Sequence, residues 1–215
     1  MGELSDVPVG VLISGSGTNL QALLDACADP DFPAKIAVVI SNRPSAYGLE
    51  RARAAGVPTV VAPHREHPDR RTYDAHLVSV LKAHQVQWVA LAGFMRLVTT
   101  TLLDAFPQRV LNIHPSLLPS FPGLDAQGQA NTYGTTVAGA TVHLVDEGMD
   151  HGPILAQGVV PAEPGEPADA LKQRILQMEH RLFPMVLRWA VEGRIRTEGR
   201  LAHIELPAGQ RRMLT

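Results

Sequence analysis

The chain has 215 residues, of which 45% are hydrophobic and 19% are charged, a balance typical of a soluble globular protein with a sizeable core. Its net charge of −2 argues against nucleic acid as the main partner, because neutralising phosphates needs a clustered basic surface. The single Cys27 excludes an intramolecular disulfide and a metal site built from cysteines. The sequence has no recognisable targeting segment and no apolar run of membrane-spanning length, so we expect a cytoplasmic protein that does not bind a membrane.

The first predicted element is a strand from Val9 to Ser14, a continuous apolar run of the kind found in parallel sheets. The glycine-containing loop from Gly15 to Asn19 follows, and a helical pattern then runs from Leu20 to Ala26. A strand, a glycine turn and a helix in this order point free backbone N–H groups at an anion. Leu20 replaces the third glycine of a dinucleotide fingerprint, and the Gly-Lys-Ser/Thr of a triphosphate loop is missing. The residues therefore fit either a cradle for a single phosphate or a plain structural turn.

Alternating strands and helices continue up to residue 114. The pattern predicts strands at 35–42, 57–61, 87–92 and 110–114, and helices at 47–55, 71–84 and 99–106. Such repeats favour a right-handed parallel sheet that carries its ligand loops at one edge. His64 and His67 have a spacing that suits a metal, but a third ligand is not evident, so we expect a solvated loop there.

Two segments near this edge have open interpretations. Arg70 opens a helix, where a cation is unfavourable, so it either reaches an anionic ligand or is simply solvated. The turn from Gly93 to Leu97 places apolar side chains at the carboxyl end of a strand, where doubly wound sheets bind ligands. Phe94 and Met95 could equally cap the core.

The segment from Val110 to His114 is the most informative stretch of the chain. Its alternation places Asn112 and His114 on one face of a strand, and Pro115 and Pro119 then hold an extended loop. An Asn amide can hold an oxygen through its N–H groups, and a His can carry a proton near neutral pH. The alternative is that both side chains only satisfy backbone groups of the loop.

The pattern changes after His114. We expect a long loop over 116–133, two antiparallel strands at 138–145 and 154–160, a helix at 169–191 and a small hairpin over 194–205. A tight acidic loop joins the two long strands. A linker or a break in composition is not evident, so we expect one domain over residues 1–215. The predicted fold class is α/β, a Rossmann-like, mostly parallel sheet with flanking helices and a C-terminal antiparallel extension.

The acidic loop suggests a chemistry for His114. A carboxylate close to an imidazole favours the charged ring, which can stabilise negative charge developing on an oxygen and move a proton. Asn112 can donate to the same oxygen, and one such donor is typically worth ~10²–10³ in rate. The residues thus indicate acyl transfer without a covalent enzyme intermediate, since a nucleophile elbow is missing and Cys27 has no His close to it in sequence.

Five stretches carry a close resemblance to the phosphoribosylglycinamide formyltransferase family, folate-dependent enzymes of purine biosynthesis. They are Leu12 to Gln21, Gly48 to Gly56, Leu91 to Arg96, Leu111 to Pro119, and Thr141 to His143 together with Met149 to Pro153. The resemblance covers nearly the whole length and implies the formyltransferase fold. It also implies formyl transfer from 10-formyltetrahydrofolate, a co-substrate, to the amine of glycinamide ribonucleotide. It implies small-molecule substrates, no metal, and a monomer or homodimer.

Carried over position by position, the resemblance implies three groups of site residues. The catalytic trio would be Asn112 and His114, which hold the formyl oxygen, and Asp150, which tunes His114 and helps to collect a proton. The ribonucleotide would bind to Gly15, Ser16, Gly17, Thr18, Asn19 and Glu179. The folate would bind to Arg70, Met95, Arg96, Leu97, Val98, Asn112, Glu147, Gly148, Met149 and Asp150, with Arg70 toward its glutamate tail.

The chain departs from the family pattern at three positions. Asp125 stands where the family commonly has His, Gly128 where it has a basic residue, and His151 where it has a small one. The nearest alternative function is formyltetrahydrofolate hydrolysis, but those enzymes carry an extra N-terminal domain and lack the glycine loop. A methionyl-tRNA formyltransferase would need an RNA-binding domain. A non-catalytic nucleotide-binding module would leave Asn112, His114 and Asp150 without a role.

Overall fold

The computed structural model describes residues 6–163 and 165–215. The chain forms two compact units, residues 1–111 and 112–215, and the strand β5 (Val110–His114) contains the boundary. Within the described ranges, no helix is both long and apolar enough to cross a membrane.

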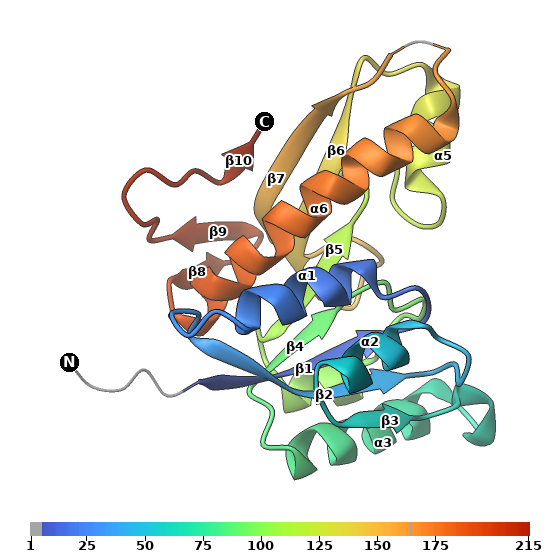
Figure 1. Cartoon of the computed structure of the whole chain (residues 1–215), viewed down its shortest axis with the longest axis vertical. Coiled ribbons are helices and arrows are strands. Elements are labelled where there is room, and N and C mark those ends of the chain that lie inside the picture. Colours follow the sequence, from blue (N-terminus) through green and yellow to red (C-terminus); the bar gives the residue numbers. More distant parts are fainter. Residues whose placement is uncertain (1–5, 164) are drawn as a thin grey trace. The chain divides into compact units, whose positions relative to one another are not determined.

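The first unit contains a sheet of parallel strands in the order β4-β1-β2-β3 (Figure 1). Their bounds are β1 Val7–Ile13, β2 Ala34–Ser41, β3 Thr59–Val61 and β4 Trp88–Leu91. Consecutive residues of β1 are fully buried, including Val11, Leu12 and Ile13, as expected where both faces of a parallel strand are covered. The predicted parallel sheet is therefore confirmed in this unit.

Helices of the first unit follow the strands as the sequence predicts. They are α1 Thr18–Cys27, α2 Gly48–Ala54, α3 Arg70–Ala83 and α4 Thr100–Ala105, with a short 3₁₀ turn η1 at His64–Glu66. The helix α1 packs on α2 and β2, whereas α3 packs on α4. The helix α3 begins where Asp69 accepts a hydrogen bond from the backbone N–H of Thr72 across 2.8 Å.

The loop with His64 and His67 is not simply solvated. The ring of His67 lies edge-on to Tyr73, with 5.3 Å between ring centroids, and 5.1 Å from the ring of His76. The residues that the structure describes contain no group of three His, Cys, Asp or Glu side chains arranged to hold a metal ion. His67 thus contributes to an aromatic cluster on α3.

The second unit has the strand order β10-β7-β6-β5. The strands β6 (Val137–Leu144) and β7 (Ile154–Pro161) are antiparallel, and β8 (Ile195–Glu198) and β9 (Leu201–Ile204) form a separate hairpin, both as predicted. A short strand β10 (Met213–Leu214) pairs with β7 in parallel and was not predicted from the sequence. The helix α6 (Ala168–Val191) lies across β6 and β7 in Figure 1 and contacts both strands. The predicted antiparallel extension is confirmed.

The prediction of a loop throughout 116–133 was wrong over its second half. Residues Ala126–Tyr133 form the helix α5, which packs against α6. The helix is bracketed by two residues in left-handed conformation, Asp125 (φ +54°) and Gly134 (φ +80°). Its buried face consists only of Ala126 and Ala130. Because small alanines between polar residues give little hydrophobic periodicity, tertiary contact rather than a local pattern stabilises this helix.

Candidate active site

Asn112 and His114 lie on the strand β5, whose sequence explains their placement. Leu111 and Ile113 are buried on the alternate face, and Pro115 ends the strand. His114 is itself only 4% exposed, although it is polar. Buried polar groups need partners, so the contacts of this ring define the site.

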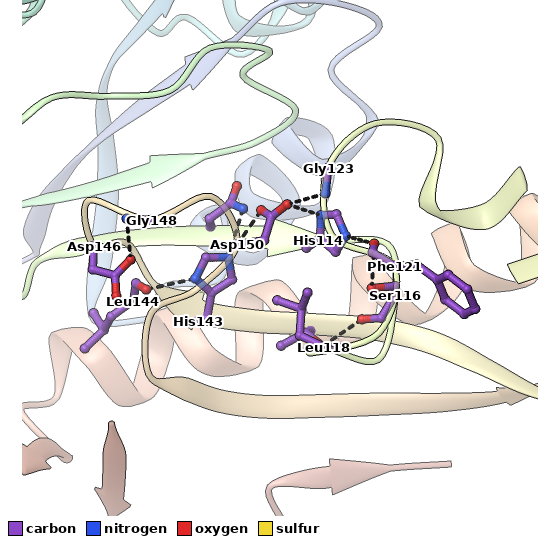
Figure 2. A network of polar contacts seen from close by, with 12 residues as sticks. His114, Ser116, Leu118, Phe121, Gly123, His143, Leu144, Asp146, Gly148 and Asp150 are labelled. Atoms are coloured by element: carbon purple, nitrogen blue, oxygen red, sulfur yellow. Dashed lines mark hydrogen bonds and ion pairs between the residues drawn. The ribbon is translucent and has the colours of Figure 1, made fainter. Parts of the chain in front are cut away.

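Both nitrogens of the His114 ring face oxygen acceptors (Figure 2). Nε2 lies 2.9 Å from the backbone carbonyl oxygen of Phe121, which can only accept, so Nε2 carries a hydrogen. Nδ1 lies 3.4 Å from Oδ2 of Asp150, and the same carboxylate oxygen accepts a hydrogen bond from the N–H of Gly123 across 2.8 Å. The ring therefore lies between a backbone acceptor and a carboxylate. The structure thus brings together the predicted acid and the predicted imidazole.

His143 is a member of this cluster that the sequence interpretation missed. Its Nδ1–H donates to the carbonyl of Leu144 across 2.8 Å, and its Nε2 accepts from the side-chain amide of Asn112 across 3.1 Å. Burial lowers the pKa of His143, which keeps the ring neutral and able to accept. Nε2 of His143 also lies 3.9 Å from Oδ1 of Asp150. The only indication of its role in the sequence was the presence of this polar residue within the apolar strand β6.

The loop that joins β6 to β7 presents Asp150 in an unusual backbone conformation. Asp150 has a φ of +51°, in the left-handed region that L residues adopt at a cost. Upstream, Oδ1 of Asp146 accepts from the N–H of Gly148 across 3.0 Å. Downstream, a Cβ added at Gly152 would lie 1.8 Å from the carbonyl oxygen of Leu144. The loop is therefore tightly constrained on both sides of its acid.

The segment that supplies the Phe121 carbonyl is also anchored. Oγ1 of Thr141 donates to the carbonyl of Ser116 across 2.7 Å and accepts from the N–H of Leu118 across 3.1 Å. The amide of Gln157 donates to the carbonyl of Leu118 across 2.9 Å. Two strands, β6 and β7, thus fix the chain immediately after His114.

The glycine loop of the first unit is packed closely against α2. Gly17 precedes α1 with a φ of +71°, and a Cβ there would lie 2.5 Å from the Cα of Gly48 on α2. The N–H of Gly48 donates to the carbonyl of Gly15 across 3.1 Å, and Nε of Arg51 donates to the carbonyl of Ser16 across 2.9 Å. Because glycine has no side chain, Gly17 supplies no side-chain hydrogen bond to cap the start of α1.

In the turn after β4, some apolar side chains are buried and others are exposed, so each of the two interpretations of its sequence holds for part of the turn. Phe94 and Val98 are buried in the core, whereas Met95 and Leu97 are 59% and 49% exposed. The hydroxyl of Ser14 accepts a hydrogen bond from the N–H of Met95 across 2.9 Å, which ties the turn to the end of β1. Two apolar side chains therefore remain on the surface at the end of a parallel strand.

The other predicted contact residues are distributed over both units. In the first unit, the guanidinium of Arg96 lies over the ring of Tyr73, 5.2 Å from its centroid, and Arg70 is exposed at the start of α3. In the second unit, Glu179 is buried on α6. The loop before Asp150 exposes Glu147, Gly148 and Met149.

Two of the departures from the family pattern are structurally linked. A Cβ added at Gly128 would lie 2.2 Å from Oδ2 of Asp125. The carboxylate of Asp125 therefore occupies the space that a side chain at position 128 would need. The acid at one position and the glycine at the other fit each other as a pair.

The sequence of this chain is similar to those of known proteins. The chain is 47% identical over 190 residues to the Trifunctional purine biosynthetic protein adenosine-3 of Drosophila pseudoobscura pseudoobscura, covering 87% of this chain but spanning only 14% of that longer protein. It is 40% identical over 197 residues to the Phosphoribosylglycinamide formyltransferase of Haemophilus influenzae, covering 92% of this chain and 93% of that one.

Structural similarity points the same way. The crystal structure of glycinamide ribonucleotide transformylase 1 from Symbiobacterium toebii superposes with a TM-score of 0.91 at 52% identity, covering 95% of both chains. The model of the formyl transferase family matches residues 8–187. The chain therefore belongs to the formyl transferase family, and within it to the phosphoribosylglycinamide formyltransferases.

Proposed function

We propose that this protein transfers the formyl group of 10-formyltetrahydrofolate to the amine of glycinamide ribonucleotide, giving formylglycinamide ribonucleotide and tetrahydrofolate in de novo purine biosynthesis. The observation that carries the proposal is the cluster in which Asp150 faces His114 while His143 holds the amide of Asn112. This set offers an oxyanion donor, a proton carrier and an acid, as acyl transfer requires.

In the proposed reaction the substrate amine attacks the formyl carbon, a C–N bond forms, and negative charge develops on the formyl oxygen. Asn112 has two amide hydrogens, so one remains for this oxygen while the other binds His143. His114, held at Nε2 by the carbonyl of Phe121 and facing Asp150 at Nδ1, would help to stabilise the same charge. The tetrahedral intermediate then breaks its bond to the folate nitrogen. The proton lost by the amine passes through Asp150 and His114 to that nitrogen.

The ligand assignments follow the same proposal. The ribonucleotide phosphate would bind the N–H groups of Gly15 to Asn19, and Glu179 would contact the same substrate. The exposed Met95, Leu97 and Met149 support a folate site with an apolar part. The folate would also use Arg70, Arg96, Val98, Asn112, Glu147, Gly148 and Asp150, with Arg70 toward the glutamate tail.

We further propose that residues 1–215 work as one formyltransferase domain, and the continuous family match over 8–187, which includes residues of both units, supports this. The proposed setting is the cytoplasm, and the proposed working form is a monomer or a homodimer acting on small molecules.

An assay of 10-formyltetrahydrofolate consumption with and without glycinamide ribonucleotide tests the function. We expect consumption that depends on the ribonucleotide. Activity should be lost in His114→Ala and in Asp150→Asn, with unchanged circular dichroism showing that both variants fold. Equal consumption without the ribonucleotide would instead identify a hydrolase.

A further inference from the structure

Three charged or polar side chains next to the proposed active site form a hydrogen-bonded chain that the proposed reaction does not use. Nδ1 of His151 lies 2.8 Å from Oδ2 of Asp146, and Nε2 of His151 lies 2.7 Å from Nη1 of Arg200. A guanidinium can only donate, so Nε2 accepts and Nδ1 carries the hydrogen that binds the carboxylate. The order of donation is therefore from Arg200 to His151 to Asp146.

The hairpin that carries Arg200 is held in place by hydrogen bonds. Arg200 lies in the turn of the β8–β9 hairpin, and Arg212 holds that hairpin to the start of β7. Nη1 of Arg212 donates to the carbonyl of Ala202 on β9 across 2.9 Å. Nη2 and Nε of the same side chain donate to the carbonyls of Ile154 and Leu155 on β7 across 2.6 and 2.9 Å. The hairpin, which lies beyond the region matched by the family model, is thus tied to the strand that follows Asp150.

The loop is also shaped to receive His151. A Cβ added at Gly148 would lie 2.7 Å from the Cβ of His151, so a side chain at position 148 would displace the ring. Asp146, which binds His151 through one carboxylate oxygen, closes the turn at Gly148 through the other. Asp150 lies between these anchors with its φ of +51°. A left-handed residue costs ~1–2 kcal/mol and needs such surrounding support to persist.

We propose that Asp146, His151 and Arg200 are positioning residues that hold the loop in the conformation aiming the Asp150 carboxylate at His114. The inference deepens the proposed function and rests on it, because Asp150 matters only if it takes part in formyl transfer. None of the three residues is assigned a contact with substrate. They act through the backbone of the loop.

The solvent exposure of these side chains predicts whether their removal affects kcat or global stability. The side chain of His151 is 61% exposed and that of Asp146 is 37% exposed, so water screens both contacts and their share of global stability is small. The conformation of a strained loop is more sensitive than global stability, because weak contacts of this kind change the population of that conformation by about two- to fivefold. Removing these contacts should therefore lower kcat and leave the melting temperature unchanged.

Steady-state kinetics with both substrates test the proposal. We expect kcat to fall about two- to fivefold in His151→Ala and in Arg200→Ala, while KM for the ribonucleotide and the melting temperature stay at their wild-type values. The double variant should be no slower than either single variant, because both remove one network. Arg200→Lys keeps a donor for Nε2 and should restore most of kcat. Arg196→Ala is the matched control, since Arg196 lies on the same hairpin and pairs with Glu205 instead.

Two outcomes overturn the inference. Wild-type kcat in both His151→Ala and Arg200→Ala would show that the network does not position the loop, and so would a rise in KM alone with kcat unchanged. Asp150→Asn, measured in parallel, separates the two proposals. If it abolishes transfer while the network variants remain fully active, only the positioning role fails. If Asp150→Asn is itself fully active, the proposed function of Asp150 fails.

Discussion

The side-chain amide of Asn112 donates to Nε2 of His143 across 3.1 Å. Because Nδ1 of His143 donates to the backbone carbonyl of Leu144, the tautomer of the ring is fixed, and with it the orientation of the amide. A donor whose direction is set before the reaction stabilises charge without reorganising. His143 thus prepares Asn112 for the role that we propose for it.

Replacing His143 by Leu tests this relationship. The variant keeps the volume of the buried site roughly filled but removes the acceptor, so the Asn112 amide is free to turn. We expect kcat to fall about ten- to a hundredfold, less than the full value of an oxyanion donor, with KM for the ribonucleotide little changed. Steady-state assays provide the measurement, and His203→Leu on the exposed face of β9 is the control. A wild-type kcat in His143→Leu would show that Asn112 does not depend on His143 for its proposed role.

The stability of the protein should also depend on His143 in acid. Burial lowers the pKa of this ring in the folded state from its ordinary value of 6.5. As the pH falls below 6.5, the unfolded chain binds a proton at this ring that the folded protein excludes, so the free energy of unfolding decreases. One such group contributes a slope of at most about 1.4 kcal/mol per pH unit. Urea titrations between neutral and mildly acidic pH should show a smaller slope for His143→Leu than for the wild type. Identical slopes would contradict the assignment.

Gly17 should be far less replaceable than another glycine with the same backbone angle. Gly17 and Gly56 both have a φ of +71°, but a Cβ at Gly17 meets the Cα of Gly48 at 2.5 Å, whereas a Cβ at Gly56 has nothing within 4 Å. Gly56→Ala should therefore cost only the conformational strain, about 1–2 kcal/mol. Gly17→Ala should cost clearly more and also weaken ribonucleotide binding. Denaturant unfolding of both variants gives the comparison, and equal losses would show that the contact with α2 is unimportant.

Arg51 should stabilise the conformation of the glycine loop, although Arg51 itself lies on α2. Its Nε donates to the carbonyl of Ser16, and its guanidinium lies over the ring of Tyr47, 5.0 Å from the centroid. Arg51→Met removes the charged hydrogen bond, and we expect KM for the ribonucleotide to rise about tenfold while KM for the folate is unchanged. Arg53→Met is the control, because Arg53 pairs with Glu50 on the same helix. An equal rise in both constants would show that the loop does not serve the ribonucleotide alone.

Much of the fold was predictable because its elements are specified locally. The apolar run of β1, the glycines that follow it and the leucines of α1 form a pattern within twenty residues, and the structure reproduces it. The same holds for β5, where alternation places Asn112 and His114 opposite Leu111 and Ile113. The hairpin of β8 and β9 was also predicted, and its turn consists of Gly199 and Arg200.

The features that escaped prediction depend on tertiary contacts. The helix α5 buries only two alanines, and β10 is a two-residue strand whose pairing with β7 leaves no periodic signal. The part played by His143 depends on the register that brings β6 beside the Asn112 amide, since its sequence alone describes a histidine in a buried strand. Likewise, His151 looked like an isolated departure until Arg200, 49 residues away along the chain, supplied its partner.

The most direct test of the account is to measure the products formed from 10-formyltetrahydrofolate and glycinamide ribonucleotide by the wild type and by Asp150→Asn. The account predicts one formylated ribonucleotide for each tetrahydrofolate released by the wild type, and almost no turnover by the folded variant. Release of tetrahydrofolate together with free formate, or a variant as fast as the wild type, would contradict it.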